Sequence, residues 1–109
     1  MAELLLREVC GLMHISRRAL QGYEKMGLVS HTGKTDKGYY LYDEVAQQRI
    51  REIRFYQDMR FKIREIKELI DAPIEEKRKV LEVQIGVLER ERQQIKITID
   101  EATKLLEKL

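Results

Sequence analysis

The sequence predicts a mainly helical fold: a winged helix-turn-helix, a two-helix extension and a long C-terminal coiled-coil helix. Three observations predict it. Residues 16–28 have the marks of a short helix with defined ends, residues 28–42 are β-prone and rich in turn residues, and from Ile74 onward apolar residues recur at alternating spacings of four and three. We therefore expect a winged helix-turn-helix domain over residues 1–72 and a dimerisation helix over residues 73–109.

The first helix is predicted over residues 5–13, where Leu6, Val9, Cys10 and Met13 share one face. Cys10 lies on that apolar face, so we expect a buried small hydrophobe and not a reactive thiol. Residues 13–15 then form a tight turn, in which His14 adopts left-handed or bridge-region geometry, which His tolerates better than most residues. A metal-binding role for His14 is disfavoured, because no second ligand is near in the sequence.

The second helix is the element on which the functional prediction depends. Ser16 is a good N-cap, and Gly27 takes a positive φ after the last turn. A turn of about three residues between two short helices predicts a helix-turn-helix, whose second helix reads DNA. One face of that helix is apolar, with Ile15, Ala19, Leu20, Tyr23 and Met26, and the other carries Arg17, Arg18, Gln21, Gly22 and Lys25.

Arginine and lysine suit phosphates, and a glutamine amide suits a base edge. Taken by itself, the helix is equally compatible with a solvated surface helix.

A small hairpin, the wing, is predicted next. Residues 28–31 form a short strand, residues 32–38 a polar turn and residues 39–42 a second strand. Tyr40 with Lys34 or Lys37 can reach phosphates from this hairpin, while either Tyr39 and Leu41 or Tyr40 and Tyr42 face the core. Packing of all three tyrosines inside the hairpin remains the alternative.

Two further helices are expected over residues 43–58 and 63–71. Asp43 caps the first, whose buried stripe we predict to contain Val45, Ile50, Ile53, and Phe55 or Tyr56. Phe61 fills the corner between the two helices. Arg60 and Lys62 flank it and offer a second set of phosphate contacts, and Pro73 ends the second helix.

The C-terminal segment predicts a coiled coil. Its stripe begins with Ile74 and Arg78 and is sustained for about five heptads, or on the order of 50 Å of helix. Such a stripe needs a partner, and a second copy of the chain is the simplest one. Packing back on the chain's own first domain is the weaker alternative, because a domain of this size has too little core to cover the stripe.

Within the stripe we expect Arg92 to fix register or orientation, and Val80, Val83 and Val87 to form a second face that docks on a domain. The predicted dimerisation residues are Leu81, Ile85, Leu88, Arg92, Ile95, Ile99, Ala102, Leu106 and Leu109.

Composition limits the function classes. The net charge is only +2, with 13 Lys and Arg against 11 Asp and Glu in residues 1–72 and 8 against 8 in residues 73–109. DNA affinity must therefore come from a local patch and rise through dimerisation. One cysteine excludes an intramolecular disulfide and a cysteine-based metal cluster.

We also find no signal peptide, no long apolar span, no paired acid and base and no phosphate-cradling glycine loop. The expectation is a cytoplasmic protein that is not an enzyme, has no cofactor or metal and does not contact a membrane.

The order of these parts resembles the MerR family of bacterial transcription regulators over nearly the whole chain, most closely its TipA-like, multidrug-responsive branch. The anchors are residues 6–10, Ser16-x-Arg18, Leu20, Tyr23-Glu24-x-x-Gly27-Leu28, Gly38-Tyr39-x-Leu41-Tyr42, Phe61, residues 66–69 and the Asp71-Ala72-Pro73 connection. Departures from the family pattern fall at His14, Ala19, Gln21, Gly22, Tyr40 and the two residues that flank Phe61. These departures leave the sequence of the bound operator open and do not affect the architecture.

The resemblance implies two chains paired through antiparallel C-terminal helices. It also implies second helices in the major groove, wings on the flanking backbone, and a promoter spacer distorted for RNA polymerase. Arg18 then corresponds to a phosphate-binding arginine, Tyr23 to the second tyrosine of a Tyr-Tyr pair, Tyr39 to a wing tyrosine and Lys34 to a frequent wing arginine.

The predicted DNA contacts are Arg17, Arg18, Gln21, Tyr23, Lys34, Lys37, Tyr39, Tyr40, Arg60 and Lys62. We thus predict a sequence-specific, dimeric transcriptional regulator whose partners are double-stranded promoter DNA, a second copy and RNA polymerase. The alternative is a coiled-coil interaction module with a vestigial helix-turn-helix. The chain is expected to be either a regulator without a sensor domain or the N-terminal part of a longer one.

Overall fold

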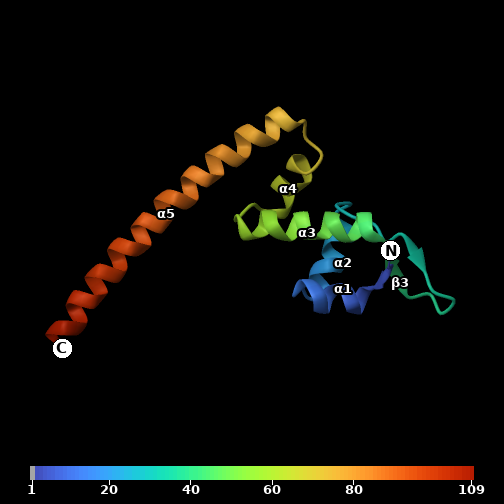
Figure 1. The fold of residues 1–109 in the computed structure, drawn as a ribbon, viewed down its shortest axis with the longest axis horizontal. Helices are drawn as coiled ribbons and strands as arrows, with labels where there is room; N and C mark the ends of the chain where they lie inside the picture. The colour runs from blue at the N-terminus through green and yellow to red at the C-terminus, as the bar shows by residue number, and fades with distance from the viewer. Residues whose placement is uncertain (1) are drawn as a thin grey trace. The chain divides into compact units, whose positions relative to one another are not determined.

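The computed structural model describes residues 2–109 (Figure 1). They divide into two compact units, and the boundary lies between Asp71 and Ala72. We call the first unit the head; the second is a single long helix. Each is described by itself.

The first two helices of the head form a helix-turn-helix. α1 spans Leu6–Met13 and α2 spans Arg17–Lys25. His14 has a φ of 53°, and the Arg54 guanidinium donates a 2.8 Å hydrogen bond to its carbonyl oxygen. The Ser16 hydroxyl accepts a 3.0 Å hydrogen bond from the Ala19 amide, and Gly27 has a φ of +75°. The predicted caps and turn are therefore confirmed, and Arg54, far along the chain, holds the turn in place.

The wing contains three strands and not the predicted two. β1 (Leu4–Leu5) and β2 (Gly33–Lys34) both pair antiparallel with β3 (Tyr40–Tyr42), so the sheet order is β1-β3-β2. The predicted strand over residues 28–31 is wrong. Leu28 and Val29 are buried core residues of an irregular segment, and the ladder begins only at Gly33. Within β3, Tyr42 is fully buried, whereas Tyr40 is partly exposed, so only one member of the predicted pair faces the core.

The two-helix extension has the predicted caps and corner. α3 spans Glu44–Asp58 and α4 spans Ile63–Leu69; the Asp43 carboxylate accepts a 2.8 Å hydrogen bond from the Ala46 amide. Arg60 ends the intervening turn with a φ of 72°. Phe61 meets Tyr56 edge to face, with ring centroids 6.1 Å apart. Phe61 thus lies at the corner between the two helices, as predicted.

The buried stripe of α3 differs from the prediction at two positions. Val45 and Phe55 are 78% and 58% exposed, whereas Ile50, Ile53 and Tyr56 are buried as predicted. Ala46 and Gln47 replace Val45 on the inner face. The Gln47 amide donates to the Tyr42 carbonyl oxygen at 2.9 Å, which ties α3 to β3.

The core of the head lies between α1, α2, β3, α3 and α4. Met26 is 40% exposed and so lies outside it, contrary to the predicted apolar face of α2. The largest fully buried side chains are Val9, Leu20, Leu28, Tyr42, Ile50, Ile53 and Ile66. Every helix of the head contributes to this core, and Ile70, which follows the last residue of α4, is buried as well.

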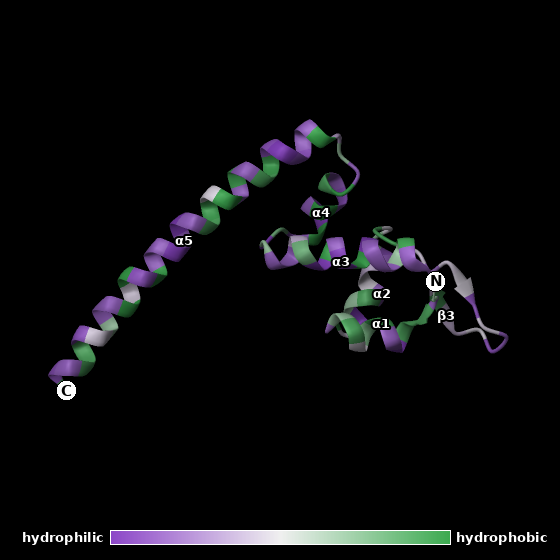
Figure 2. Ribbon diagram, in the orientation of Figure 1, coloured by the Kyte–Doolittle hydropathy of each residue, from purple (hydrophilic) through white to green (hydrophobic). Residues whose placement is uncertain are grey.

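The second unit is α5, Ile74–Lys108, one helix of 35 residues. None of its residues is buried, and apolar residues recur along its whole length (Figure 2). Ile85, Ile99 and Leu106 are 51%, 58% and 71% exposed. The predicted helix is confirmed, and its pairing stays a prediction. No helix of the described residues is long and apolar enough to cross a membrane.

Candidate nucleic-acid interface

The outer face of α2 is polar and positively charged. Leu20 and Tyr23 anchor its inner face with 0% and 2% of their surface exposed. The side chains of Arg17, Arg18, Gln21 and Lys25 are therefore turned outward, and all four are exposed. Three cationic groups and one amide on a helix of this size can serve phosphates and a base edge together.

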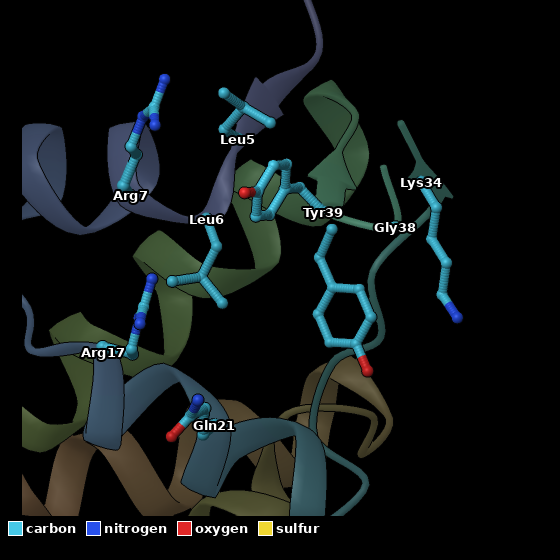
Figure 3. Close-up of a pocket in the computed structure, with 9 residues that line it drawn as sticks. Leu5, Leu6, Arg7, Arg17, Gln21, Lys34, Gly38 and Tyr39 are labelled. Atoms are coloured by element: carbon cyan, nitrogen blue, oxygen red, sulfur yellow. The ribbon is translucent and has the colours of Figure 1, made fainter. Parts of the chain in front are cut away.

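A groove of about 580 Å³ separates α2 from the wing (Figure 3). We call it the wing groove. Its described lining residues include three cations and no carboxylate, so the groove favours an anion. The residues that line it are Leu5, Leu6, Arg7, Arg17, Gln21, Lys34, Gly38, Tyr39 and Tyr40.

The wing groove brings together five of the predicted contact residues, from two elements. Arg17 and Gln21 come from α2, and Lys34 and Tyr39 from the wing (Figure 3). Tyr40 of the wing lines the groove with them. Sequence reasoning missed Arg7, an outward residue of α1 that joins them. Its place depends on β1, because that strand pairs the start of α1 with the wing.

A tight turn presents the tip of the wing. The Thr35 amide donates to the Tyr39 carbonyl oxygen at 2.9 Å, and the Gly38 amide donates to the Thr35 carbonyl oxygen at 2.8 Å. Gly38 has a φ of +85°, a conformation that favours glycine. Lys37 is exposed in this turn, and Tyr39 just after it is 61% exposed. Both side chains are free to meet a surface beside α2.

The opposite flank of α2 faces the start of α4. An apolar notch of about 210 Å³ is lined there by Ala19, Gly22, Tyr23, Met26, Gln57 and Ile63. Arg60 and Lys62 are exposed in the loop that leads to Ile63. The α3–α4 loop therefore offers cations on one side of α2, while the wing offers them on the other.

Tyr23 differs from the other predicted contacts, because it belongs to the core. Its hydroxyl donates a hydrogen bond to the Gln57 side-chain oxygen. Burial, the largest influence, raises the pKa of Tyr23 above 10.0. The neutral, buried phenol donates its proton to Gln57 and so holds α2 against the helix that carries Gln57, and the DNA contact of Tyr23 stays a prediction.

Glu24 connects α2 to the wing. One carboxylate oxygen accepts a hydrogen bond from the Tyr42 hydroxyl, and the other lies 2.8 Å from His31 Nδ1. Burial alone would raise the pKa of the Glu24 carboxyl, but the hydrogen bonds from Tyr42 and His31 outweigh it and lower that pKa below 4.5. Burial, and then the bond to Glu24, raises the pKa of Tyr42. The pair thus joins an ionised carboxylate to a neutral phenol at neutral pH.

The described residues hold no group of three or more His, Cys, Asp or Glu side chains arranged for a metal ion. The predicted dimerisation residues all lie on α5 or at its end, at Leu109. Arg92 forms a 2.6 Å ion pair with Glu89 on the same helix.

Residues 5–73 match the sequence family described as MerR HTH family regulatory protein. The chain is 29% identical over 89 residues to the HTH-type transcriptional activator mta of Bacillus subtilis, covering 82% of this chain and 35% of that protein. It is 26% identical over 90 residues to the HTH-type transcriptional activator TipA of Streptomyces coelicolor, covering 76% of this chain and 36% of that protein. The chain thus spans about a third of the length of these relatives.

Solved structures give the same fold. The crystal structure of MtaN, the N-terminus of the Bacillus subtilis multidrug transporter activator, aligns with a TM-score of 0.72 at 27% identity, covering 94% of this chain and 97% of that one. HiNmlR, a MerR family regulator lacking the sensor domain and bound to promoter DNA, aligns with a TM-score of 0.75 at 19% identity, covering 91% and 80%. The fold class predicted from the sequence is thereby confirmed.

Proposed function

The chain belongs to the MerR HTH family of regulatory proteins, and from this premise we propose that it is a dimeric, sequence-specific regulator that binds promoter DNA in the cytoplasm. The observation that carries the proposal is the wing groove. It aligns Arg17 and Gln21 of α2 with Lys34, Tyr39 and Tyr40 of the wing on one positively charged face.

In the proposed complex, residues 1–72 act as the DNA-binding domain, with α2 in the major groove. Gln21 reads a base edge, and Arg17 and Arg18 hold phosphates beside it. The wing, through Lys34, Lys37, Tyr39 and Tyr40, and the α3–α4 loop, through Arg60 and Lys62, hold the backbone on the two flanks. The promoter-bound structure of HiNmlR supports this use of the fold.

Residues 73–109 are proposed to pair with the same segment of a second chain in an antiparallel coiled coil. The exposed apolar residues along α5 support this proposal, because a lone helix would leave them in water. Two heads at a fixed separation then contact one near-palindromic promoter site. Grips on both sides of the promoter spacer allow the protein to bend and untwist it, which changes its use by RNA polymerase.

Footprinting on the promoter of its own gene, combined with filter binding at several salt concentrations, tests the proposal. The expected result is one near-palindromic protected site whose affinity falls steeply with salt. Gln21→Ala should reduce discrimination between that site and a site with altered bases while it keeps most of the affinity for random DNA. Unchanged discrimination would remove Gln21 from the base contacts.

A coiled-coil interaction module is the competing function, and the exposed stripe of α5 is equally compatible with it. Sedimentation with and without promoter DNA separates the two. A regulator sediments as a dimer that shifts to a larger complex when the duplex is added. A stable homodimer that ignores DNA would favour the interaction module.

A further inference from the structure

The segment between α2 and the wing carries a polar side chain that contacts both. His31 lies in the irregular stretch that connects Leu28 to β2. Its Nδ1 lies 2.8 Å from Glu24 Oε1 on α2, and its backbone amide points at the same oxygen at 3.4 Å. One edge of the imidazole is thus fixed to the last turn of the helix that we place in the major groove.

The face of the same imidazole is fixed to the wing. His31 stacks on Tyr40 with ring centroids 3.7 Å apart and an angle of 6° between the planes. Lys34 pairs with Tyr40 in the β2–β3 register, and its ammonium group lies 5.5 Å from the centre of the Tyr40 ring. A continuous contact therefore runs from the Glu24 carboxylate through His31 and Tyr40 to the Lys34 ammonium group.

We propose that His31 is a positioning residue, which holds Tyr40 and Lys34 at a fixed place beside α2 so that both can grip the DNA backbone. The inference rests on the proposed function of the wing groove. His31 is not among the residues that line that groove, whereas Tyr40 and Lys34 are, so His31 acts through them.

A purely architectural role for His31 is less consistent with the contacts. Tyr42 is fully buried and already joins β3 to Glu24 through the other carboxylate oxygen. The base of the wing is therefore attached to α2 without His31. The imidazole side chain is 26% exposed, and what it adds is the orientation of the two groove residues. Loss of His31 should leave the head folded and weaken DNA binding.

The contacts are tested first without DNA. The chain has only two histidines, so its NMR spectrum has two sets of imidazole signals, and His31→Ala assigns them. Stacking predicts that the His31 ring protons are shifted upfield by the Tyr40 ring and return toward the His14 values in Tyr40→Leu. His31 signals that do not respond to Tyr40→Leu would overturn the proposal.

A double-mutant cycle on DNA then tests the route of the effect. Wild type, His31→Ala, Lys34→Ala and the double variant are titrated into the duplex that the wild type protects. We expect His31→Ala and Lys34→Ala each to weaken binding by about tenfold, as expected for a lost phosphate contact in both heads. The double variant should bind more weakly than Lys34→Ala, because Tyr40 also depends on His31, but its loss should be smaller than the product of the two single losses, because part of the His31 effect acts through Lys34. Additive losses, or wild-type affinity for His31→Ala, would overturn the proposal.

Two further variants separate positioning from folding. His31→Phe keeps an aromatic ring for Tyr40 and should recover part of the affinity that His31→Ala loses. His14→Asn is the matched control. It should bind as wild type, since Asn also tolerates the positive φ at this position. Backbone-contact footprinting should show weakened protection only at the flanking phosphates of the wing in His31→Ala. Uniform weakening over the site would indicate a folding defect and contradict the proposal. If the wild type does not bind DNA, the proposed function fails as well. If only the inference about His31 fails, the wild type still binds DNA.

Discussion

The head and α5 bury their apolar residues in opposite ways. In the head, Leu20, Ile50 and Ile53 have no exposed surface at all, and their partners come from the same unit. α5 has 35 residues, against 15 in the longest helix of the head, but none of its residues is buried. The head thus carries a complete core, whereas the apolar stripe of α5 is explained only by a partner. This difference supports the proposed dimer with two reading heads.

The largest expected effect comes from breaking the stripe of α5. Ile95→Lys places a charge on the proposed dimer contact and should convert the protein to a monomer in sedimentation. Because each head would then bind alone, affinity for the promoter site should fall by roughly a hundredfold or more.

Gln93→Lys is the matched control for this variant. It introduces the same charge two residues away, off the stripe, and should leave a dimer with wild-type affinity. A monomeric Gln93→Lys variant, or a dimeric Ile95→Lys variant, would contradict the assignment of the stripe as the dimer contact.

The same deletion in the two units should have unequal effects on folding. Ile53→Ala removes a fully buried side chain from α3 and should lower the free energy of unfolding of the head by roughly 2–4 kcal/mol. Ile97→Ala removes a side chain that is 40% exposed on α5 and lies off the stripe, and should leave the unfolding of the head unchanged. Urea titration followed by the fluorescence of the head tyrosines measures both. Equal losses would contradict the independence of the two units.

A smaller effect is expected on the DNA-facing side of the head. Arg18→Ala removes an exposed guanidinium from α2 and should weaken binding by about tenfold on every DNA sequence. It should also make the salt dependence of binding shallower, because fewer counterions are displaced. Lys104→Ala on α5 changes the net charge by the same amount and is the control, with no expected effect. A change in sequence preference in Arg18→Ala would move this residue from the phosphate contacts to the base contacts.

The smallest effect concerns acid stability. The pKa of Glu24 is lowered in the folded head, so its contribution to stability is present above pH 4.5 and is lost as the pH falls through the lower folded value. In thermal unfolding, wild type should therefore lose more stability than Glu24→Gln as the pH is lowered from about 5 to about 3, the interval around the reference pKa of a carboxyl group. Parallel pH profiles for the two proteins would contradict this assignment.

Local signals explain which parts of the fold could be predicted from the sequence. The Ser16 and Asp43 caps, the left-handed His14 and the positive φ of Gly27 each depend on a few adjacent residues, and the structure confirms all of them. The wing is only partly predictable from local signals, because β1 exists only through its pairing with residues of β3 far along the chain. Residues 28–31 are β-prone, but burial of Leu28 and the bond of His31 to Glu24 take them out of the sheet.

The candidate site follows the same division. The outward residues of α2 follow from helical periodicity, since burial of Leu20 and Tyr23 fixes the orientation of the helix. The Tyr23 contact to Gln57 and the place of Arg7 in the wing groove depend on contacts between elements, which no local pattern encodes. Val45 shows the same effect in α3, where a small Ala46 next to it occupies the inner face.

In the proposed function, two self-contained heads, joined by α5, bind one promoter site together. Sedimentation equilibrium of the protein with its footprinted duplex tests this claim directly, with a full site and with a half-site. We expect a complex of two chains and one duplex on the full site and much weaker binding to the half-site. One chain for each duplex, with equal affinity for the full site and the half-site, would contradict it.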